Sequence, residues 1–432
     1  MQPTRVLTGI TTSGTPHLGN YVGAIRPAVA ASRVAGAESF YFLADYHALI
    51  KVTDPARIQR STLEIAATWL ACGLEPDKVW FYRQSDVPET TELTWLLTCV
   101  AGKGMLNRAH AYKAAVDRNR AEQQDDDAAV TAGLFMYPVL MAADILLFNA
   151  HKVPVGRDQI QHIEMARDIG QRFNHLYGEH FTLPEAVVDE HVATLPGLDG
   201  RKMSKSYDNT IELFAPRETL RKLIGSILTD SLAPGEPKNP DDSNVFQLYQ
   251  AFASADETRA MREAFADGIA WGEAKQALLE RIDLELAPLR DKYQTLLARP
   301  AEIEAILRDG ARRLRDTHAT PTMARLREAV GLRDLSVDRG SRKQANAGPK
   351  PVLPQFKQYR GDDGRFYFKL VQGDCVLLQS DGFAAPRDAG QRVAQLKSQG
   401  RLDRSDATLS LGEGVGVDQV DAALAALAQS ES

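Results

Sequence analysis

The turn at residues 11–20 gathers residue types suited to binding a phosphate group. It reads TTSGTPHLGN and follows a run of β-formers, RVLTGI. Gly14 and Gly19 let the backbone approach a phosphate closely, because glycine has no β-carbon. A helical pattern begins directly after the turn, and a helix N-terminus offers free N–H groups. His17 and Asn20 would add hydrogen-bond donors; the alternative is that both only cap the turn.

A second stretch, LDGRKMSKSYDN at residues 198–209, carries two lysines three positions apart. In a glycine-led loop, Lys202 and Lys205 would clamp a pyrophosphate and stabilise charge that develops in the transition state. Ser204 and Ser206 would hold the loop or contact phosphate. Taken alone, such a lysine pair more often marks a solvated charged loop. The first turn is neither GxGxxG nor a P-loop, which disfavours a nicotinamide enzyme or a P-loop kinase.

Together, HLGN and KMSKS resemble the two signatures of class I aminoacyl-tRNA synthetases, with Asn20 where the family usually has a second histidine. Their order along the chain also agrees with that family. The resemblance implies that His17, Asn20, Lys202 and Lys205 are catalytic. It further implies that ATP contacts these residues and Thr11, Thr12, Ser13, Gly19, Gly156, Arg157, Asp158, Leu195, Met203, Ser204 and Ser206.

The segments GLFMYPVLMAADILLF and VPVGRDQIQHIEMARDIGQRFN resemble the tryptophanyl branch of that family. Indole has one hydrogen-bond donor and no acceptor, so its pocket needs a buried acceptor and an adaptable apolar wall. Met141 and Asp144 share one face of a helix. By the resemblance, Asp144 accepts the indole N–H and Met141 packs on the ring. Tyr137 and Gln159 are implied to hold the α-amino group.

Alternatives stay open for individual residues of this set. His47 matches a family pocket position, but a satisfied core histidine is the simpler reading. Asp144 could instead be a surface carboxylate, although a carboxylate without a partner in so apolar a segment would be costly. His162 and Glu164 are two apart on a helix and diverge, so they do not form a metal site.

The implied reaction has two steps and several partners. The carboxylate of L-tryptophan attacks the α-phosphorus of ATP and releases pyrophosphate, and tRNA(Trp) then displaces AMP. We expect Mg²⁺ to be bound with ATP and water, and no protein metal site. A homodimer in the cytoplasm is carried over from the family. Six arginines late in the helical region would meet the RNA backbone, or else form solvated faces: Arg312, Arg313, Arg315, Arg325, Arg327 and Arg333.

Three rival functions share parts of this pattern. A tyrosyl-tRNA synthetase has the same architecture but lacks the MAADIL run. A catalytically silent, synthetase-like RNA-binding protein would tolerate loss of the nucleotide signatures, which are present here. A small-molecule adenylyltransferase would leave the helical region unexplained.

The elements that position these residues alternate strands with helices. RVLTGI, SFYFLAD, KVWFYRQ, DILLF and AVVD read as buried strands. Helical patterns occupy 54–73 and 156–178, the first with Asp54 as N-cap and Pro55 at its first position. This alternation predicts an α/β domain with a doubly wound, parallel, Rossmann-like sheet.

The rest of the chain divides into further predicted parts. We expect the catalytic α/β domain at 1–210 and a helical bundle that reads the anticodon at 211–335. A polar, proline-containing linker occupies 336–354. A small α+β module follows at 355–432, with a three-stranded meander, turns at residues 363–364 and 373–374, and one helix. It resembles small uncharacterised βββα modules.

Bulk composition restricts the class of protein. The 432 residues carry a net charge of −6, which argues against indiscriminate DNA binding. Cys72, Cys99 and Cys375 have no zinc or disulfide spacing. We see no signal peptide and no transmembrane run, which predicts a soluble protein of a reducing compartment.

Two segments depart from the family pattern. Thr11 and Thr12 stand where many relatives carry Gln-Pro, which leaves the contacts of that position open. The acidic stretch at residues 114–133 is longer than expected. It is either a mobile loop over the site or a disordered, solvated insertion, and we favour the insertion.

Overall fold

The computed structural model describes residues 3–12, 14–188, 195–332, 354–373, 375–403, 406 and 408–430. The chain divides into two compact units, Met1–Arg333 and Asp334–Ser432, and each is described by itself. The predicted linker lies almost entirely outside the described residues. The boundary between a catalytic and an anticodon-reading domain falls inside the first unit and stays a prediction.

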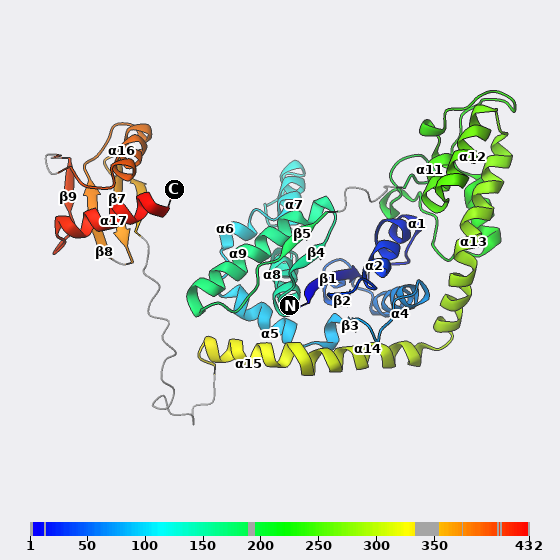
Figure 1. The fold of residues 1–432 in the computed structure, drawn as a ribbon, viewed down its shortest axis with the longest axis horizontal. Coiled ribbons are helices and arrows are strands. Elements are labelled where there is room, and N and C mark those ends of the chain that lie inside the picture. Colours follow the sequence, from blue (N-terminus) through cyan, green and yellow to red (C-terminus); the bar gives the residue numbers. More distant parts are fainter. Residues whose placement is uncertain are drawn as a thin grey trace. The chain divides into compact units, whose positions relative to one another are not determined.

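The first unit is built on a parallel five-stranded sheet (Figure 1). Its strand order is β3-β2-β1-β4-β5. The chain adds β2 and β3 on one side of β1 and then crosses over to add β4 and β5 on the other side, so the direction of strand addition changes between β1 and β4. In open α/β sheets, ligands bind beyond the carboxyl ends of the strands at such a switch point. The strands are β1 (Thr4–Thr11), β2 (Ala37–Ala44), β3 (Trp80–Arg83), β4 (Lys152–Pro154) and β5 (Glu185–Val187). The predicted doubly wound sheet is confirmed.

Both faces of the sheet are covered because its strand residues alternate. Tyr41 and Leu43 pack on one side with Trp69 of α4. Phe40 and Phe42 pack on the other side, in the cluster that contains α8 and α9. The helices of this half are α1 (Leu18–Asn20), α2 (Arg26–Ala31), α3 (Asp45–Ala48), α4 (Pro55–Ala71), α5 (Glu89–Thr98), α6 (Lys103–Leu106), α7 (His110–Ala121), α8 (Ala132–Leu146) and α9 (Ile160–Tyr177).

Two local predictions were wrong. DILLF is not a strand, because Asp144, Ile145 and Leu146 complete α8. A continuous apolar run does not distinguish a buried strand from a buried helix. The short strand β4 was missed in consequence. The acidic stretch is also ordered: α7 continues to Ala121, and the following turn is closed by the Arg120–Asp126 ion pair.

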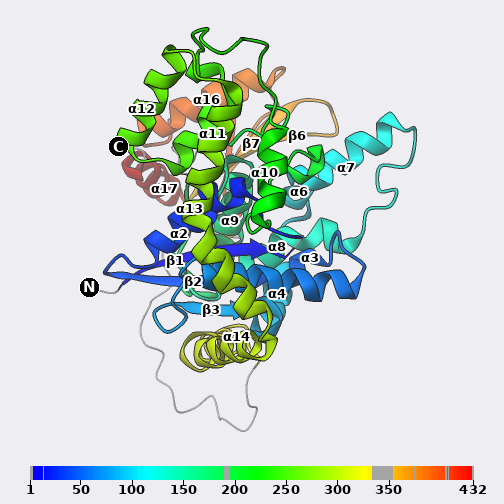
Figure 2. The same cartoon turned by 90° about the vertical axis from the view of Figure 1, so that its right-hand side faces the viewer.

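The second half of the unit is helical, as predicted, and its end packs against the sheet. Its helices are α10 (Arg217–Gly225), α11 (Asn244–Phe252), α12 (Ala255–Ala266), α13 (Trp271–Leu297), α14 (Pro300–Leu314) and α15 (Thr320–Ala329). In Figures 1 and 2, α14 lies beside β3. The approach is close at Gly310, where an added β-carbon would lie 1.9 Å from the Phe81 carbonyl oxygen.

Two arginines at the end of this region join it to α5, and three others form contacts within their own helices. Arg315 pairs with Glu89 and Arg327 with Glu92, both on α5. Arg312 and Arg313 pair with Asp309, and Arg325 donates to the Thr322 hydroxyl. Arg333 lies outside the described residues. The described arginines are therefore engaged within the fold, which weakens the prediction that they meet RNA.

The second unit contains a four-stranded antiparallel sheet with order β6-β7-β8-β9. Its elements are β6 (Gln355–Arg360), β7 (Phe366–Gln372), β8 (Cys375–Ser380), α16 (Pro386–Gln399), β9 (Leu409–Leu411) and α17 (Val417–Ser430). The predicted meander and first helix are present. β9 and α17 were not predicted. For β9 the reason is that a three-residue strand carries little periodicity.

Candidate active site

The turn after β1 forms a short capped helix. His17 is the N-cap of α1: its Nδ1 accepts from the Asn20 N–H at 3.3 Å, while Asn20 Oδ1 accepts from the His17 N–H at 3.1 Å. Burial and the nearby Lys205 cation lower the pKa of His17 to about 4. A neutral imidazole with Nδ1 as acceptor leaves Nε2–H as a donor. Capping and ligand binding are thus compatible at His17.

The other residues of the turn differ in exposure. Thr11 ends β1 and is exposed, whereas Thr12 is buried, and its hydroxyl has no hydrogen-bond partner among the described residues. Ser13 lies outside the described residues. Gly14 has a φ of +136°, a conformation that favours glycine. A β-carbon on Gly19 would lie 3.0 Å from the His17 ring.

The lysine loop is organised around Asn209, a buried residue that the sequence did not single out. Its Oδ1 accepts from the Ser204 N–H at 2.8 Å, and its Nδ2 donates to Asp199 Oδ1 at 2.6 Å. Met203 is buried, and its N–H donates to the carbonyl oxygen of Leu195 at 2.9 Å. The Ser204 hydroxyl accepts from the Ser206 N–H, which caps the turn that contains Lys205.

This loop lies against the first turn. A β-carbon on Gly14 would be 3.1 Å from the Lys205 Nζ. The segment after the loop pairs with the turn as well, because the Leu18 N–H donates to the Ile211 carbonyl oxygen at 2.9 Å. Partial burial and Arg57 lower the pKa of Lys205. Lys202 and Ser206 are exposed. Two signatures almost 200 residues apart in sequence are thus brought together.

A second group surrounds the carboxylate of Asp144, which is buried. His47 Nε2 donates to its Oδ2 at 2.8 Å, and Gln84 Nε2 donates to both oxygens at 2.8 and 3.0 Å. Burial raises the pKa of Asp144, and these donors oppose that rise. A carboxylate has about four acceptor sites, so a further donor can still bind it. Met141 is half-buried on the same helix.

A directed chain of hydrogen bonds links Tyr137 to the end of β4. The Tyr137 hydroxyl bonds His162 Nε2, whose Nδ1 bonds Gln159 Oε1 at 3.1 Å. Gln159 Nε2 donates to Asp158 Oδ2 at 2.8 Å. Burial lowers the pKa of His162, which favours the neutral ring. With Nδ1–H donating to Gln159, Nε2 accepts from Tyr137, and the tyrosine oxygen remains an acceptor.

The stretch after β4 begins with a close turn. Gly156 precedes the short helix Arg157–Gln159, and a β-carbon on Gly156 would lie 2.7 Å from Asp158 Oδ1. Arg157 and Asp158 are exposed. The His47 and Tyr137 rings are 6.5 Å apart in an edge arrangement, so the Asp144 group and the Tyr137 chain are neighbours.

Comparison with known proteins identifies the family. Residues 1–287 match the model described as tRNA synthetases class I (W and Y). A tryptophan–tRNA ligase from Xanthomonas axonopodis pv. citri is 74% identical over 396 residues, which cover 91% of each chain. The chain belongs to the class I tRNA synthetases of the tryptophan and tyrosine type.

Two further relatives agree with this family. The Pseudomonas aeruginosa tryptophan–tRNA ligase is 63% identical to this synthetase, over 90% of this chain and 87% of its own. The crystal structure of the Campylobacter jejuni tryptophanyl-tRNA synthetase, complexed with ADP and tryptophan, is 42% identical with a TM-score of 0.70. It covers 76% of this chain and 100% of its own. The predicted enzyme class and function, a tryptophan–tRNA ligase, are confirmed.

Besides Asn209, sequence reasoning missed two further residues of the candidate site, Gln84 and His162. Gln84 directly follows the third buried strand, and polar residues at strand ends are candidates in any parallel sheet. His162 was considered only as a metal ligand, although it lies three residues from Gln159 at a helix start. Among the described residues, no group of three His, Cys, Asp or Glu side chains could hold a metal ion.

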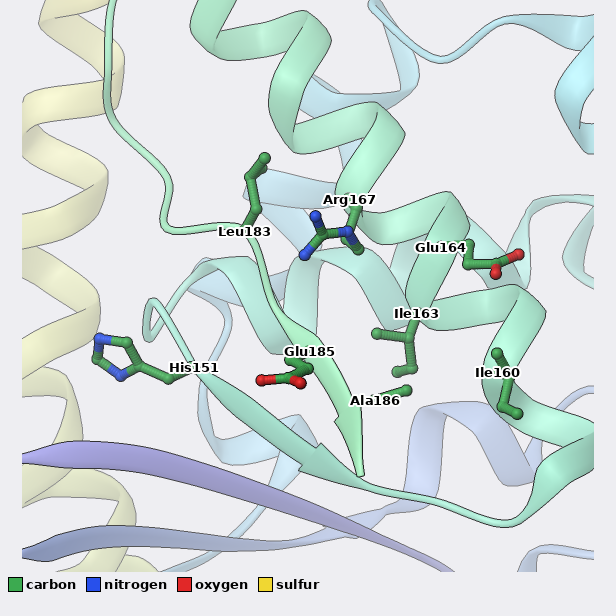
Figure 3. Close-up of a pocket in the computed structure, with 8 residues that line it drawn as sticks. All are labelled: His151, Ile160, Ile163, Glu164, Arg167, Leu183, Glu185 and Ala186. Atoms are coloured by element: carbon green, nitrogen blue, oxygen red, sulfur yellow. The ribbon is translucent and has the colours of Figure 1, made fainter. Parts of the chain in front are cut away.

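A surface depression of about 590 Å³ between α9 and β5 is not this site (Figure 3). Its lining residues are His151, Ile160, Ile163, Glu164, Arg167, Leu183, Glu185 and Ala186, none of which is a predicted site residue. His151 precedes β4 and Glu185 begins β5, so the depression reaches the amino edge of the sheet, opposite the ligand-binding edge. No helix in the described parts of the chain is long and apolar enough to span a membrane.

Proposed function

We propose that this synthetase selects tryptophan through the Asp144 carboxylate as held by His47 and Gln84. The observation that carries the proposal is the geometry of that carboxylate: buried, bonded by donors on both oxygens, and still able to accept one more N–H. The indole N–H supplies the missing donor, and Met141 lines the ring. Phenylalanine lacks that donor, so the buried carboxylate disfavours it.

The Tyr137 chain suits an ammonium group. An ammonium only donates hydrogen bonds, and the chain directs the Tyr137 proton toward His162, which leaves the tyrosine oxygen as an acceptor. Gln159 is held between His162 and Asp158. We assign the substrate's α-amino group to Tyr137 and Gln159, so the carboxylate points toward the first turn.

The chemistry of activation is displacement at phosphorus. The tryptophan carboxylate oxygen forms a bond to the α-phosphorus of ATP while the bond to pyrophosphate breaks. Lys205 and Lys202 face the leaving pyrophosphate, and His17 contributes its Nε2–H as a donor. Thr11, Thr12, Ser13, Gly19, Gly156, Arg157, Asp158, Leu195, Met203, Ser204 and Ser206 complete the predicted nucleotide site. A tRNA ribose hydroxyl then attacks the acyl carbon and releases AMP.

Mg²⁺ enters with the nucleotide in this proposal. Mg²⁺ usually keeps several waters and binds together with substrate phosphates, so the ion's ligands come from ATP phosphates and water rather than from a protein cage. When bound, the ion neutralises phosphate charge. A homodimer in the cytoplasm that takes tRNA(Trp) and L-tryptophan completes the proposal, and neither DNA nor a membrane has a part in it.

The test is ATP–pyrophosphate exchange, measured separately with tryptophan, with tyrosine and with phenylalanine as the amino acid. We expect exchange with tryptophan alone, and a loss of about 10²–10³-fold in Lys205→Ala, because a preorganised charge at the leaving group is removed. Lys222→Ala, an exposed lysine of α10, is the matched control. Exchange with phenylalanine, which offers Asp144 no donor, would contradict the assignment of Asp144, and exchange unchanged in Lys205→Ala would contradict that of the loop.

A further inference from the structure

The sheet of the second unit exposes one of its faces. Phe368, Leu370 and Leu378 are buried beneath α16 and α17 with Leu396 and Leu424. Because strand side chains alternate between faces, their neighbours in sequence point the other way. On that second face Lys357, Tyr359, Gln379 and Ser410 are exposed, and Tyr367 and Lys369 are half-buried.

The strand register arranges these side chains in two rows. Lys357 lies opposite Lys369, which lies opposite Gln379, which lies opposite Ser410. In the next row Tyr359 lies opposite Tyr367. The two tyrosine rings stack with centroids 5.5 Å apart and planes inclined by 16°. Lys369 Nζ is 5.6 Å from the centroid of the Tyr359 ring. A cationic row and an aromatic row therefore run side by side.

The lysines on this face lack ion-pair partners among the described residues. Like charges placed directly opposite each other in a sheet are destabilising. Neither Lys357 nor Lys369 forms an ion pair with a residue that the structure describes. The four strands contain three cationic side chains, Lys357, Arg360 and Lys369, and no acidic one. The whole chain carries −6. Stability alone does not favour this arrangement, whereas binding of a polyanion does.

Asp363 borders the face but forms no ion pair with either lysine. Asp363, in the turn between β6 and β7, accepts from the Tyr367 hydroxyl at 2.6 Å and from the Arg365 N–H at 3.0 Å. The bond holds the Tyr367 ring in its stacked orientation. A fixed aromatic surface next to two unpaired cations is suited to a ligand with both flat rings and phosphates.

We propose that this face binds unpaired nucleotides of the tRNA substrate, an inference that rests on the function proposed above. Tyr359 and Tyr367 stack on bases, and Lys357 and Lys369 contact the phosphates between them. The match to the Xanthomonas axonopodis ligase spans 396 residues, more than the 333 of the first unit. The second unit is therefore at least partly shared with a protein that acts on tRNA, which favours RNA over an acidic protein.

The test uses the full-length chain and a tRNA(Trp) transcript, with filter binding at several salt concentrations. Lys357→Ala/Lys369→Ala should weaken binding about tenfold. It should reduce the slope of log Kd against log salt by about 1.4, because each single-strand phosphate contact contributes about 0.7. Tyr359→Ala should weaken binding about tenfold, and Tyr359→Phe should not, since the ring remains.

Controls separate the outcomes. Arg387→Ala removes an exposed cation of α16 and should leave the Kd unchanged. Pyrophosphate exchange needs no tRNA and reports the proposed function separately. If the wild-type chain shows no exchange but the lysine variant still loses tRNA affinity, the proposed function fails and this inference stands. An unchanged Kd and salt slope in the folded lysine variant, or competition by duplex RNA as strong as that by single strands, would overturn it.

Discussion

At the scale of single residues, the site works through the protonation states of buried histidines. Burial lowers the pKa of His162 and favours its neutral ring, in which Nδ1 donates to Gln159 and Nε2 accepts from Tyr137. His17 is neutral for the same reason, because burial and Lys205 disfavour a second positive charge in the turn. In the proposed site, a neutral His17 would therefore act on phosphate as a hydrogen-bond donor rather than as a counter-ion.

The lowered pKa of His17 predicts that the stability of the protein depends on pH. The pKa of His17 is lowered from 6.5 to about 4 in the folded protein. The unfolded chain therefore binds more protons between these values, and stability falls as the pH decreases from 6.5 to 4. In urea unfolding, the free energy of unfolding should fall less in His17→Asn than in wild type as the pH decreases across that window. The difference should be on the order of 1–2 kcal/mol, less than the full pKa shift implies, because the ring keeps partial solvent contact. His175→Asn, at an exposed position, should behave as wild type; identical curves for His17→Asn would contradict the lowered pKa.

At the scale of elements, the helical half packs closely on the sheet at Gly310. Gly310 brings α14 onto the backbone of β3, and the Arg315–Glu89 and Arg327–Glu92 pairs fasten the following residues to α5. Gly310 contacts Phe81 of β3, and Gln84 of the Asp144 group follows three residues later.

We therefore expect Gly310→Ala to destabilise the first unit strongly. The new β-carbon would meet the Phe81 carbonyl oxygen at 1.9 Å, so helix or strand must move, at a cost of about 3 kcal/mol or more. Gly272→Ala in α13 has no atom within 4 Å and should be neutral or stabilising by about 0.5–1 kcal/mol. Thermal and urea unfolding measure both. Equal midpoints for the two variants would show that α14 and β3 are not in close contact.

At the scale of the whole molecule, we expect tryptophan activation to be independent of the second unit. Every predicted site residue lies in the first unit, which has its own core clusters. A chain truncated after Arg333 should retain tryptophan-dependent pyrophosphate exchange within about twofold of wild type, because no group of the site is removed. Aminoacylation should show a raised KM for tRNA. Loss of exchange in a truncated chain that is folded by circular dichroism would contradict this separation.

The sequence by itself determined the family and most of the elements. KMSKS and the tryptophan-type segments are local patterns, and strand and helix periods are local as well, so both can be read without the fold. The tertiary structure decided which groups meet. Gln84, His162 and Asn209 carry no motif, and they enter the site because strand ends and loops from distant segments converge at one edge of the sheet. DILLF was predicted as a strand for a related reason. It is buried on all sides, so its sequence lacks the hydrophobic periodicity that distinguishes a helix from a strand. Cross-strand register likewise places Lys357 opposite Lys369, and no local pattern encodes that pairing.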